Sequence, residues 1–282
     1  MAVCEPLAFG SKWIPSMKAP LRSLMWLAAL ATQALAVAQP TPVRHLDRIA
    51  AAHAVRVCIW PDYYGITYRD PRTQRLSGID IDMARELGKD LGAEVQFVDS
   101  SFAKLIDDVT QDACDVAMFA IGITPARAKR LQFTSPHLAS DIYAVVSKTN
   151  RRIKDWSDID KVGTVVAVAK GTLHESVMTD KLKAASLLVL DTPFAREQEV
   201  QSGRADVFMT DYPYSQRFLP TAEWASLMKP PTTYHVTPYA YAIAPGDGAW
   251  HARLEKFVAD IKRDGRLMEA ARRHRLDVLV VP

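Results

Sequence analysis

The sequence contains little of what marks several other classes of protein. It has three cysteines in 282 residues. None stands in a Cys-x-x-Cys pair or in a His/Cys cluster with metal-ligand spacing, so we expect no metal and no cofactor. It has no basic block and a formal net charge of only +3, so we expect no nucleic-acid partner. It also shows no tandem repeat, no low-complexity linker and, after the first 38 residues, no apolar run near the roughly 20 residues of a membrane-spanning helix.

The apolar run near the N-terminus predicts a secretory signal peptide over Met17–Ala38. Lys18 and Arg22 supply its positive start, Leu24–Ala36 supplies its apolar centre, and its last three residues have the small-x-small form of a cleavage site. The alternative, a buried N-terminal helix, lacks capping residues. Residues 1–38 therefore form a leader, an upstream extension followed by the signal peptide, and we expect a periplasmic protein.

Export changes the interpretation of the cysteines. Cys4 lies in the leader, which leaves Cys58 and Cys114 as an even pair in an oxidising compartment. Both lie beside apolar strand patterns, so two buried free thiols are the alternative to a disulfide. The leader also carries +2 of the net charge, which leaves about +1 for the exported chain.

After the leader, short apolar runs alternate with helical patterns, which is typical of βαβ units and mostly parallel sheets. The expected strands form two series: Val55–Trp60, Val95–Val98 and Asp115–Phe119, then Val165–Ala169, Leu187–Leu190 and Asp206–Met209. The expected helices include Met83–Leu91, Phe102–Val109 and Trp250–Arg263. Because the series restarts, the second is a separate unit and not an extension of the first sheet.

The chain crosses between the two units near Tyr143–Lys148 and again near Pro238–Ala242, which predicts two lobes around a cleft. We therefore assign residues 39–144 to lobe 1, residues 145–237 to lobe 2, and residues 238–282 to a return into lobe 1. The expected fold class is α/β, with a mostly parallel sheet flanked by helices in each lobe.

The segment Thr124–Arg127 is a candidate anion site. It follows a buried strand directly; Thr124 suits a helix N-cap, and Pro125 suits the first helical position. Free backbone N–H groups gather at such a helix start, and the guanidinium of Arg127 adds a fork that matches a carboxylate. An arginine there is otherwise unfavourable against the helix dipole. The alternative is a solvated surface arginine.

The second unit offers a similar strand-to-helix junction at Gly171–Glu175. Thr172 and Glu175 fit a capping box, so we interpret Glu175 as a capping residue and not as a catalytic acid. Thr172 and the Gly171 backbone remain candidate donors to a ligand. His174 has no partner pattern around it, and we expect it to be exposed.

Asp211 ends the strand of the second unit, with aromatic residues just after it. A carboxylate in this position is a candidate to hold a ligand ammonium, and a turn or cap residue is the alternative. Trp60, Tyr63 and Phe102 lie at strand ends or in loops of the first unit. Core packing is the alternative for these aromatic residues, above all for Phe102.

These motifs, taken in order from about Leu46 to Arg272, resemble the polar-amino-acid type of bacterial extracellular solute-binding proteins that serve ABC importers. The segments that carry the resemblance are Arg56–Tyr63, Gly78–Met83, Phe102–Ile106, Asp115-Val116, Thr124–Arg127, Phe133–Pro136, Gly171-Thr172 and Asp211. The resemblance implies a two-lobed periplasmic-binding-protein-like fold that closes around a small carboxylate ligand, with an amino acid as the first expectation. It also implies an ABC permease as partner, a monomer and no catalysis.

The resemblance assigns roles to individual residues. It implies that Arg127 clamps the ligand carboxylate and that Asp211 holds an α-ammonium. It places the ligand side chain between Tyr63 and Phe102, while Thr172 closes over it from lobe 2.

Three residues depart from the family's pattern. Gly122 stands where the family usually has a small hydroxyl residue, and Leu173 stands where it has a small or polar one. Trp60 stands where binders of cationic side chains can carry an acid. The departures argue against a lysine- or arginine-type ligand and favour an apolar or aromatic side chain, or a ligand that is not a standard amino acid.

Two further resemblances leave alternative functions open. Some periplasmic cyclohexadienyl dehydratases are similar to this family, although they carry a Glu nearer the Gly-Thr pair than Glu175. The segments around Cys58 and Cys114 resemble a subgroup of this fold that is associated with periplasmic quinoprotein alcohol dehydrogenases, which suggests an accessory protein. In the sheet that the resemblance implies, the first and third strands are neighbours, which favours a Cys58–Cys114 disulfide inside lobe 1.

Overall fold

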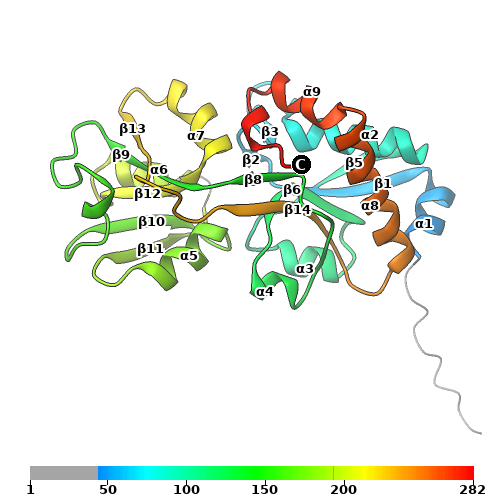
Figure 1. Ribbon diagram of the computed structural model, residues 1–282, viewed down its shortest axis with the longest axis horizontal. Coiled ribbons are helices and arrows are strands. Elements are labelled where there is room, and N and C mark those ends of the chain that lie inside the picture. The colour runs from blue at the N-terminus through cyan, green and yellow to red at the C-terminus, as the bar shows by residue number, and fades with distance from the viewer. Residues whose placement is uncertain (1–43, 193) are drawn as a thin grey trace, which may run out of the picture. The chain divides into compact units, whose positions relative to one another are not determined.

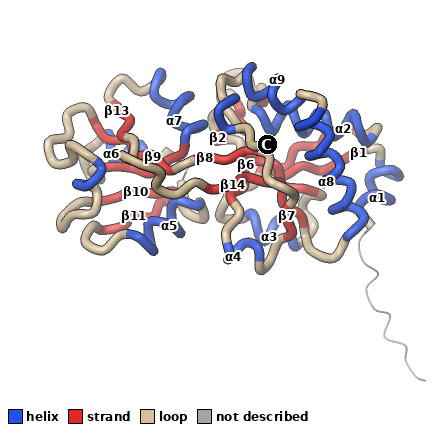
Figure 2. The backbone as a smooth tube through the Cα atoms, in the orientation of Figure 1, coloured by secondary structure: helices blue, strands red, loops and turns tan. Residues whose placement is uncertain are grey.

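The computed structural model describes residues 44–192 and 194–282 and folds them into two mixed sheets flanked by helices (Figures 1 and 2). The predicted signal peptide, Met17–Ala38, and Cys4 lie outside the described residues. None of the helices in the described ranges is long and apolar enough to cross a membrane. The contacts hold both sheets in one compact unit.

The first sheet, which we call lobe 1 together with its helices, has the strand order β5-β1-β6-β14-β7, with β8 paired to β14. Its strands are β1 (Ala54–Ile59), β5 (Glu94–Asp99), β6 (Val116–Gly122), β7 (Gln132–Phe133), β8 (Leu138–Ser140) and β14 (Thr237–Ile243). β5, β1 and β6 are parallel, as predicted, whereas β14 runs antiparallel to β6. A small antiparallel sheet adds β2 (Asp62–Tyr63), β3 (Thr67–Arg69) and β4 (Leu76–Ser77).

Helices cover both faces of this sheet (Figure 1). They are α1 (His45–Ala52), α2 (Ile79–Leu91), α3 (Leu105–Thr110), α4 (Pro125–Ala128), α8 (Gly248–Arg263) and α9 (Arg266–Arg273). α2 packs on β1, β5 and β6, and α3 packs on β6 and β14. The sequence did not predict α9, because its apolar stripe of Leu267, Ala270 and Ala271 is short and surrounded by arginines.

The second sheet, which we call lobe 2 together with its helices, has the order β11-β10-β12-β9-β13. Its strands are β9 (Ile142–Ser147), β10 (Val165–Ala169), β11 (Ser186–Leu190), β12 (Val207–Asp211) and β13 (Ala225–Met228). The three predicted strands are parallel, β9 runs antiparallel to β12, and β13 runs antiparallel to β9. Its helices are α5 (Leu173–Lys181), α6 (Ala195–Gln201) and α7 (Tyr212–Phe218). Single 3-10 turns occur at Trp156–Asp158, Leu219–Thr221 and Asp277–Leu279.

The chain changes sheet at Asp141, between β8 and β9, and returns through β14. The carboxylate of Asp141 accepts hydrogen bonds from the backbone N–H groups of Tyr234 (2.9 Å) and His235 (2.7 Å), which ties the two crossing segments together. β12 pairs along its whole length with residues Ile142–Val146 of β9. The first change of sheet therefore falls just before the boundary that the sequence suggested at residue 144.

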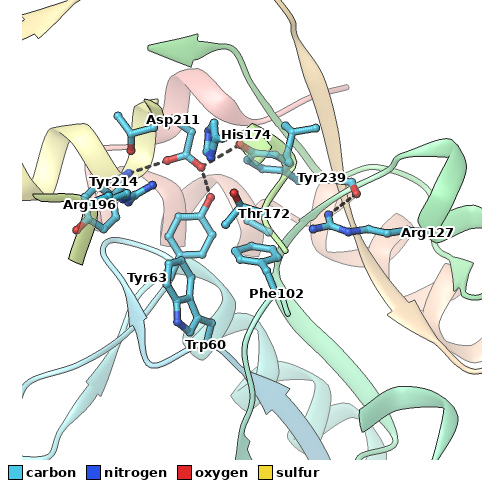
Figure 3. A pocket seen from close by; sticks show the side chains of 14 residues that line it. Trp60, Tyr63, Phe102, Arg127, Thr172, His174, Arg196, Asp211, Tyr214 and Tyr239 are labelled. Carbon is cyan, nitrogen blue, oxygen red and sulfur yellow. Dashed lines mark hydrogen bonds between the residues drawn. The ribbon is translucent and has the colours of Figure 1, made fainter. Parts of the chain in front are cut away.

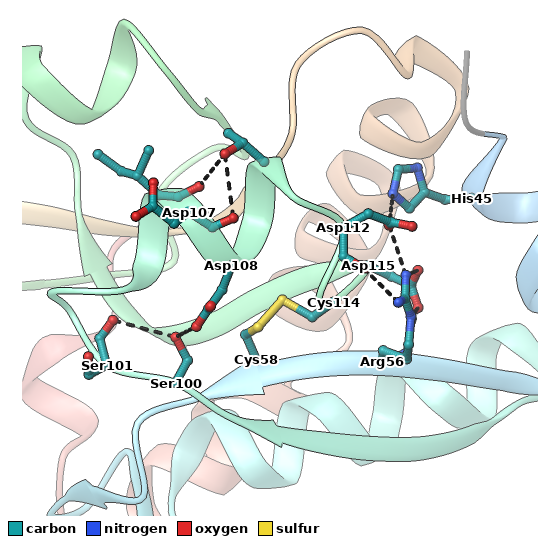
Figure 4. The surroundings of a disulfide bond; sticks show 12 residues. His45, Arg56, Cys58, Ser100, Ser101, Asp107, Asp108, Asp112, Cys114 and Asp115 are labelled. Carbon is teal, nitrogen blue, oxygen red and sulfur yellow. Dashed lines mark hydrogen bonds and ion pairs between the residues drawn. A yellow bond between two sulfur atoms is a disulfide. The ribbon is translucent and has the colours of Figure 1, made fainter. Parts of the chain in front are cut away.

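Cys58 and Cys114 form a disulfide within lobe 1 (Figure 4). Cys58 lies on β1 and Cys114 lies just before the neighbouring strand β6, with their Cα atoms 5.6 Å apart, which is within the range that a disulfide spans. The alternative of two free thiols is wrong. Neither cysteine lines the pocket described below.

Candidate functional site

One pocket is lined by side chains from both sheets (Figure 3). Its lining residues are Trp60, Tyr63, Phe102, Ala120, Gly122, Arg127, Thr172, Leu173, His174, Arg196, Thr210, Asp211, Tyr214 and Tyr239. All the predicted ligand-binding residues except Thr124 and Gly171 are among them. The free volume is ≈ 20 Å³, about the space that one water molecule needs. The protein's own groups therefore fill most of this site.

The junction from β6 to α4 positions Arg127 as the sequence predicted. Thr124 is the N-cap, and its Oγ1 accepts a hydrogen bond from the backbone N–H of Arg127 (3.2 Å), while Pro125 occupies the first turn. Thr124 itself lies beside the pocket, in a wider adjoining groove. It therefore holds the helix start in place without lining the cavity.

The guanidinium of Arg127 lies inside the pocket and has no acidic partner among the described residues. Its Nη1 donates to the carbonyl of Gly122 (2.8 Å) and its Nη2 to the carbonyl of Gly171 (2.9 Å), and it lies over the ring of Phe102. Only 6% of the residue is exposed, so the solvated surface arginine is the wrong alternative. Burial lowers the pKa of Arg127 to about 10, and the group stays charged at neutral pH.

Asp211 brings a buried carboxylate to the same pocket. One oxygen accepts from the backbone N–H of Tyr214 (3.1 Å), so Asp211 also caps α7. The other oxygen accepts hydrogen bonds from the hydroxyls of Tyr63 and Tyr239 (Figure 3). Burial raises the pKa of Asp211, although these three hydrogen bonds act in the opposite direction.

The aromatic residues of lobe 1 contact one another. The ring centres of Trp60, Tyr63 and Phe102 lie 5.3–5.8 Å apart. The planes of Tyr63 and Phe102 are tilted by 69° with their centres 5.8 Å apart, an edge-to-face contact. A flat group between two rings needs a separation of about 7 Å, twice a carbon contact distance. In this structure the two rings therefore leave no slot for a side chain.

The start of α5 brings lobe 2 against lobe 1. Thr172 caps this helix: its Oγ1 accepts from the backbone N–H of Glu175 (3.4 Å), and the Glu175 carboxylate accepts from the backbone N–H of Gly171. Gly171 has φ +75°, and a Cβ there would lie 2.5 Å from the backbone N and Cα of Ala103 in lobe 1. The lobes can therefore meet in this arrangement only with glycine at this position.

Gly122 also leaves no room for a side chain. A Cβ at this position would lie 3.0 Å from Cγ2 of Thr237 and 3.7 Å from the side chain of Leu173. The small hydroxyl residue of the family pattern would be crowded here. The Gly122 carbonyl accepts a hydrogen bond from Arg127, and glycine offers no side-chain hydroxyl to a ligand carboxylate.

The expectation that His174 is exposed is wrong. Only 7% of it is exposed, because the first turn of α5 lies in the contact between the lobes and points its second residue into the pocket. Burial, followed by the nearby guanidinium of Arg196, lowers the pKa of His174 to about 3. The ring is therefore neutral at any physiological pH.

Sequence reasoning also missed Arg196, which lies 5% exposed on α6. Its Nε donates to the carboxylate of Glu197 (2.7 Å), which also accepts from the hydroxyl of Tyr214 (2.8 Å). The guanidinium lies over the rings of Phe208 and Tyr214. No sequence pattern marks Arg196, whereas Tyr239 lies within the crossing segment predicted at Pro238–Ala242.

The described residues contain one group with metal-ligand proximity, His45, Asp112 and Asp115, whose ligand atoms lie within 4.8 Å of one another. Arg48 and Arg56 both donate hydrogen bonds to the two carboxylates, and Figure 4 shows Arg56 beside them. Two guanidinium groups already balance this negative charge. The group is therefore a structural ion-pair network.

The fold and the pocket define an α/β binding protein whose site is built from two sheets that the chain visits in turn. The chain belongs to family 3 of the bacterial extracellular solute-binding proteins, whose family model matches residues 55–276. The resemblance seen in the sequence is thereby confirmed.

Similar proteins include a binding protein and an enzyme. The chain is 32% identical to cyclohexadienyl dehydratase of Pseudomonas aeruginosa over 66% of its own length and 69% of that protein. It is 26% identical to ABC transporter arginine-binding protein 1 of Escherichia coli over 67% of its own length and 77% of that protein.

Solved structures confirm the fold class. An ancestral amino acid-binding protein, a precursor of cyclohexadienyl dehydratase, matches with a TM-score of 0.74 and 28% identity over 81% of this chain and 98% of that one. An amino acid ABC transporter substrate-binding protein from Streptococcus pneumoniae, bound to L-arginine, matches with a TM-score of 0.74 over 81% and 97% of the two chains. At 20% identity, the second likeness shows the fold alone.

Proposed function

We propose that the chain is the periplasmic component of an ABC importer, that it binds a small α-amino acid between its lobes, and that it is not an enzyme. The observation that carries the proposal is the charge on Arg127. A buried guanidinium without an acid is costly, because two carbonyl groups replace its hydration only in part. A ligand carboxylate would supply the missing negative charge through a paired hydrogen bond.

The second support is the position of Asp211 in the same pocket. An α-ammonium bound there would replace the hydroxyls of Tyr63 and Tyr239, just as the ligand carboxylate would replace the Gly122 and Gly171 carbonyls on Arg127. Each exchange keeps the buried group hydrogen-bonded and adds an opposite charge. Binding then shifts the equilibrium between open and closed lobes, and a membrane permease reads the closed state.

Isothermal titration calorimetry of the exported chain against the standard amino acids tests the proposal. We expect one group of amino acids to bind, and Arg127→Gln to weaken that binding about 100-fold, because charged hydrogen bonds contribute about 1.5–3 kcal/mol. Arg130→Gln, a change at an exposed arginine of the same region, is the matched control and should bind normally. Equal affinity in the two variants would contradict the proposal.

The similarity to cyclohexadienyl dehydratase keeps an enzyme as the second candidate. Asp211 is the acid that lines the pocket, and its carboxylate accepts three hydrogen bonds, which suits charge recognition better than proton transfer. Incubation with prephenate or arogenate, with detection of an aromatic product by absorbance, separates the candidates. Product formation that Asp211→Asn abolishes would replace the binding-protein proposal with an enzymatic one.

A further inference from the structure

The lobe 2 side of the pocket contains polar atoms without partners. Across the described part of the chain, five buried side-chain nitrogen or oxygen atoms lack a hydrogen bond. Three of them line this pocket: Nδ1 and Nε2 of His174 and Oγ1 of Thr210. Thr210 is fully buried and His174 is 7% exposed. The nearby Thr210 backbone acts to raise the pKa of His174. It nevertheless does not meet the distance and angle of a hydrogen bond with either ring nitrogen.

Such atoms are expensive to bury. A buried polar group without a partner costs about 1–3 kcal/mol, and buried side-chain polar atoms in folded proteins are mostly hydrogen-bonded. His174 lies beside Asp211 in the pocket (Figure 3), and Thr210 directly precedes Asp211 on β12, so all three atoms line the pocket that also contains Arg127. The arrangement is that of a recognition surface that is completed by the ligand.

We propose that His174 and Thr210 form a subsite that hydrogen-bonds an uncharged polar group, so that the protein selects amino acids with carboxamide or hydroxyl side chains. The inference rests on the proposed function, because it needs the amino acid to be anchored by Arg127 and Asp211. It replaces the apolar or aromatic side chain that the sequence suggested from Leu173.

The chemistry of the two residues excludes the other classes of side chain. Neutral His174 has one donor and one acceptor, and the Thr210 hydroxyl can act as either. A carboxamide or hydroxyl matches this set. A carboxylate can only accept hydrogen bonds, so the acceptor nitrogen of His174 would stay without a partner. An apolar side chain would leave all three atoms without a partner.

The charges nearby exclude a cationic side chain. Arg127 and Arg196 both line the pocket and both lower the pKa of His174, which shows that their charges reach this ring. Asp211 is the acid among the lining residues, and the ammonium of the ligand uses it. Glu197 is already bound by Arg196 and the hydroxyl of Tyr214. The lining residues therefore offer no further carboxylate to a lysine or arginine side chain.

The test is calorimetry of Thr210→Val with L-glutamine, L-asparagine, L-serine and L-threonine, and with L-arginine, L-glutamate and L-leucine as representatives of the other classes. Valine has the shape of threonine without the unpartnered hydroxyl. We expect a neutral polar amino acid to bind tightest to the wild type, and its Kd to rise about tenfold in Thr210→Val. The unliganded variant should melt at the same temperature or about 2–4 °C higher. His174→Leu should weaken the same ligand.

Thr134→Val is the matched control. Thr134 is equally buried, but its hydroxyl accepts from the backbone N–H of Tyr241 (3.1 Å) and donates to the carbonyl of Ser135. This variant should lose stability and keep its affinity. A variant that loses affinity but not stability marks a recognition residue, whereas a variant that loses stability but not affinity marks a structural one.

The outcomes also separate this inference from the proposed function. If L-arginine, L-glutamate or L-leucine binds tightest, the subsite is wrong and the binding function stands. The same conclusion holds if Thr210→Val and His174→Leu leave the best ligand's Kd unchanged while Arg127→Gln abolishes binding. If no amino acid binds the wild type, both proposals fall.

Discussion

Two clusters of arginine and aspartate in this protein differ in how they are paired. In lobe 1, Arg48 and Arg56 donate hydrogen bonds to Asp112 and Asp115, so positive and negative charges balance. In the pocket, Arg127 donates only to backbone carbonyls. The two clusters contain the same residue types.

A structural charge cluster differs from a recognition site in what satisfies its charges. A balanced network satisfies itself and needs no further group. The Arg127 charge and the Asp211 carboxylate of the pocket are instead held by neutral groups of the protein, which a ligand of matching charge can replace. The pKa shifts agree with this contrast. Burial decides the direction of the pKa shift for Arg127 and Asp211, whereas hydrogen bonds from arginine decide it for Asp112.

The largest expected effect concerns the lobe 1 cluster and its disulfide. Replacing both Cys58 and Cys114 with serine should lower the free energy of unfolding by about 4 kcal/mol, because the bond closes a loop of 56 residues. Chemical denaturation measures this loss. Ligand affinity should not change, because neither cysteine lines the pocket. A large loss of affinity in a folded double variant would show that the two regions are coupled.

The next effect concerns the pocket alone. Gly171→Ala should weaken ligand binding about 100-fold, a loss of about 2.7 kcal/mol, because the new Cβ would lie 2.5 Å from the backbone of Ala103 and hold the lobes apart. Gly203→Ala is the matched control: Gly203 has φ +76°, but a Cβ there meets nothing within 4 Å. Both variants carry the same backbone strain, so calorimetry on the pair isolates the contact between lobes. Equal ligand affinity in the two variants would show that the approach of Gly171 to Ala103 does not limit binding.

Removing one arginine from each cluster should affect stability to different extents. Arg56→Gln should lower the free energy of unfolding by about 1–2 kcal/mol, because it leaves Asp112 and Asp115 with less positive charge. Arg127→Gln should lower the free energy of unfolding by less, or should stabilise the unliganded protein, because it removes a buried charge that no acid of the described residues balances. Urea denaturation without ligand gives both values. The comparison fails if Arg127→Gln is the more destabilising of the two.

The smallest effect is a difference in pH dependence. Burial raises the pKa of Asp211, so its ionisation opposes folding, and stability falls as the pH rises from about 3.9 through the raised value. Burial also acts to raise the pKa of Asp112, but the hydrogen bonds from Arg48 and Arg56 outweigh it and hold that pKa below its usual range. The ionised Asp112 therefore stabilises the folded protein above about pH 3.9, and this stabilisation is lost as the pH falls through the lowered pKa.

Denaturation curves of Asp211→Asn and Asp112→Asn between pH 3 and pH 7 test these signs. Relative to the wild type, Asp211→Asn should gain stability as the pH rises. Asp112→Asn should show its largest deficit near neutral pH and a smaller one in acid. Parallel curves for the two variants would remove the distinction between the clusters.

Much of this protein follows from the sequence alone, because the signals are local. The alternating apolar runs predict the parallel strands of both sheets, and the caps at Thr124 and Thr172 form between residues three apart in the chain. The order of the motifs identifies the family, and with it Arg127 and Asp211 as pocket residues. The family resemblance also favours the disulfide, and the structure places Cys58 on β1 and Cys114 just before the neighbouring strand β6.

Only the tertiary structure decided how the two halves of the pocket meet. The hydrogen bond from Tyr63 to Asp211 joins residues that are 148 positions apart, and no local pattern encodes such a contact. The same is true of His174, whose place in an ordinary first helical turn predicts exposure until lobe 1 covers it. Arg196 and Thr210 likewise become pocket residues through packing between elements. Burial depends on what the rest of the chain places on top of a residue, and the sequence around that residue does not contain this information.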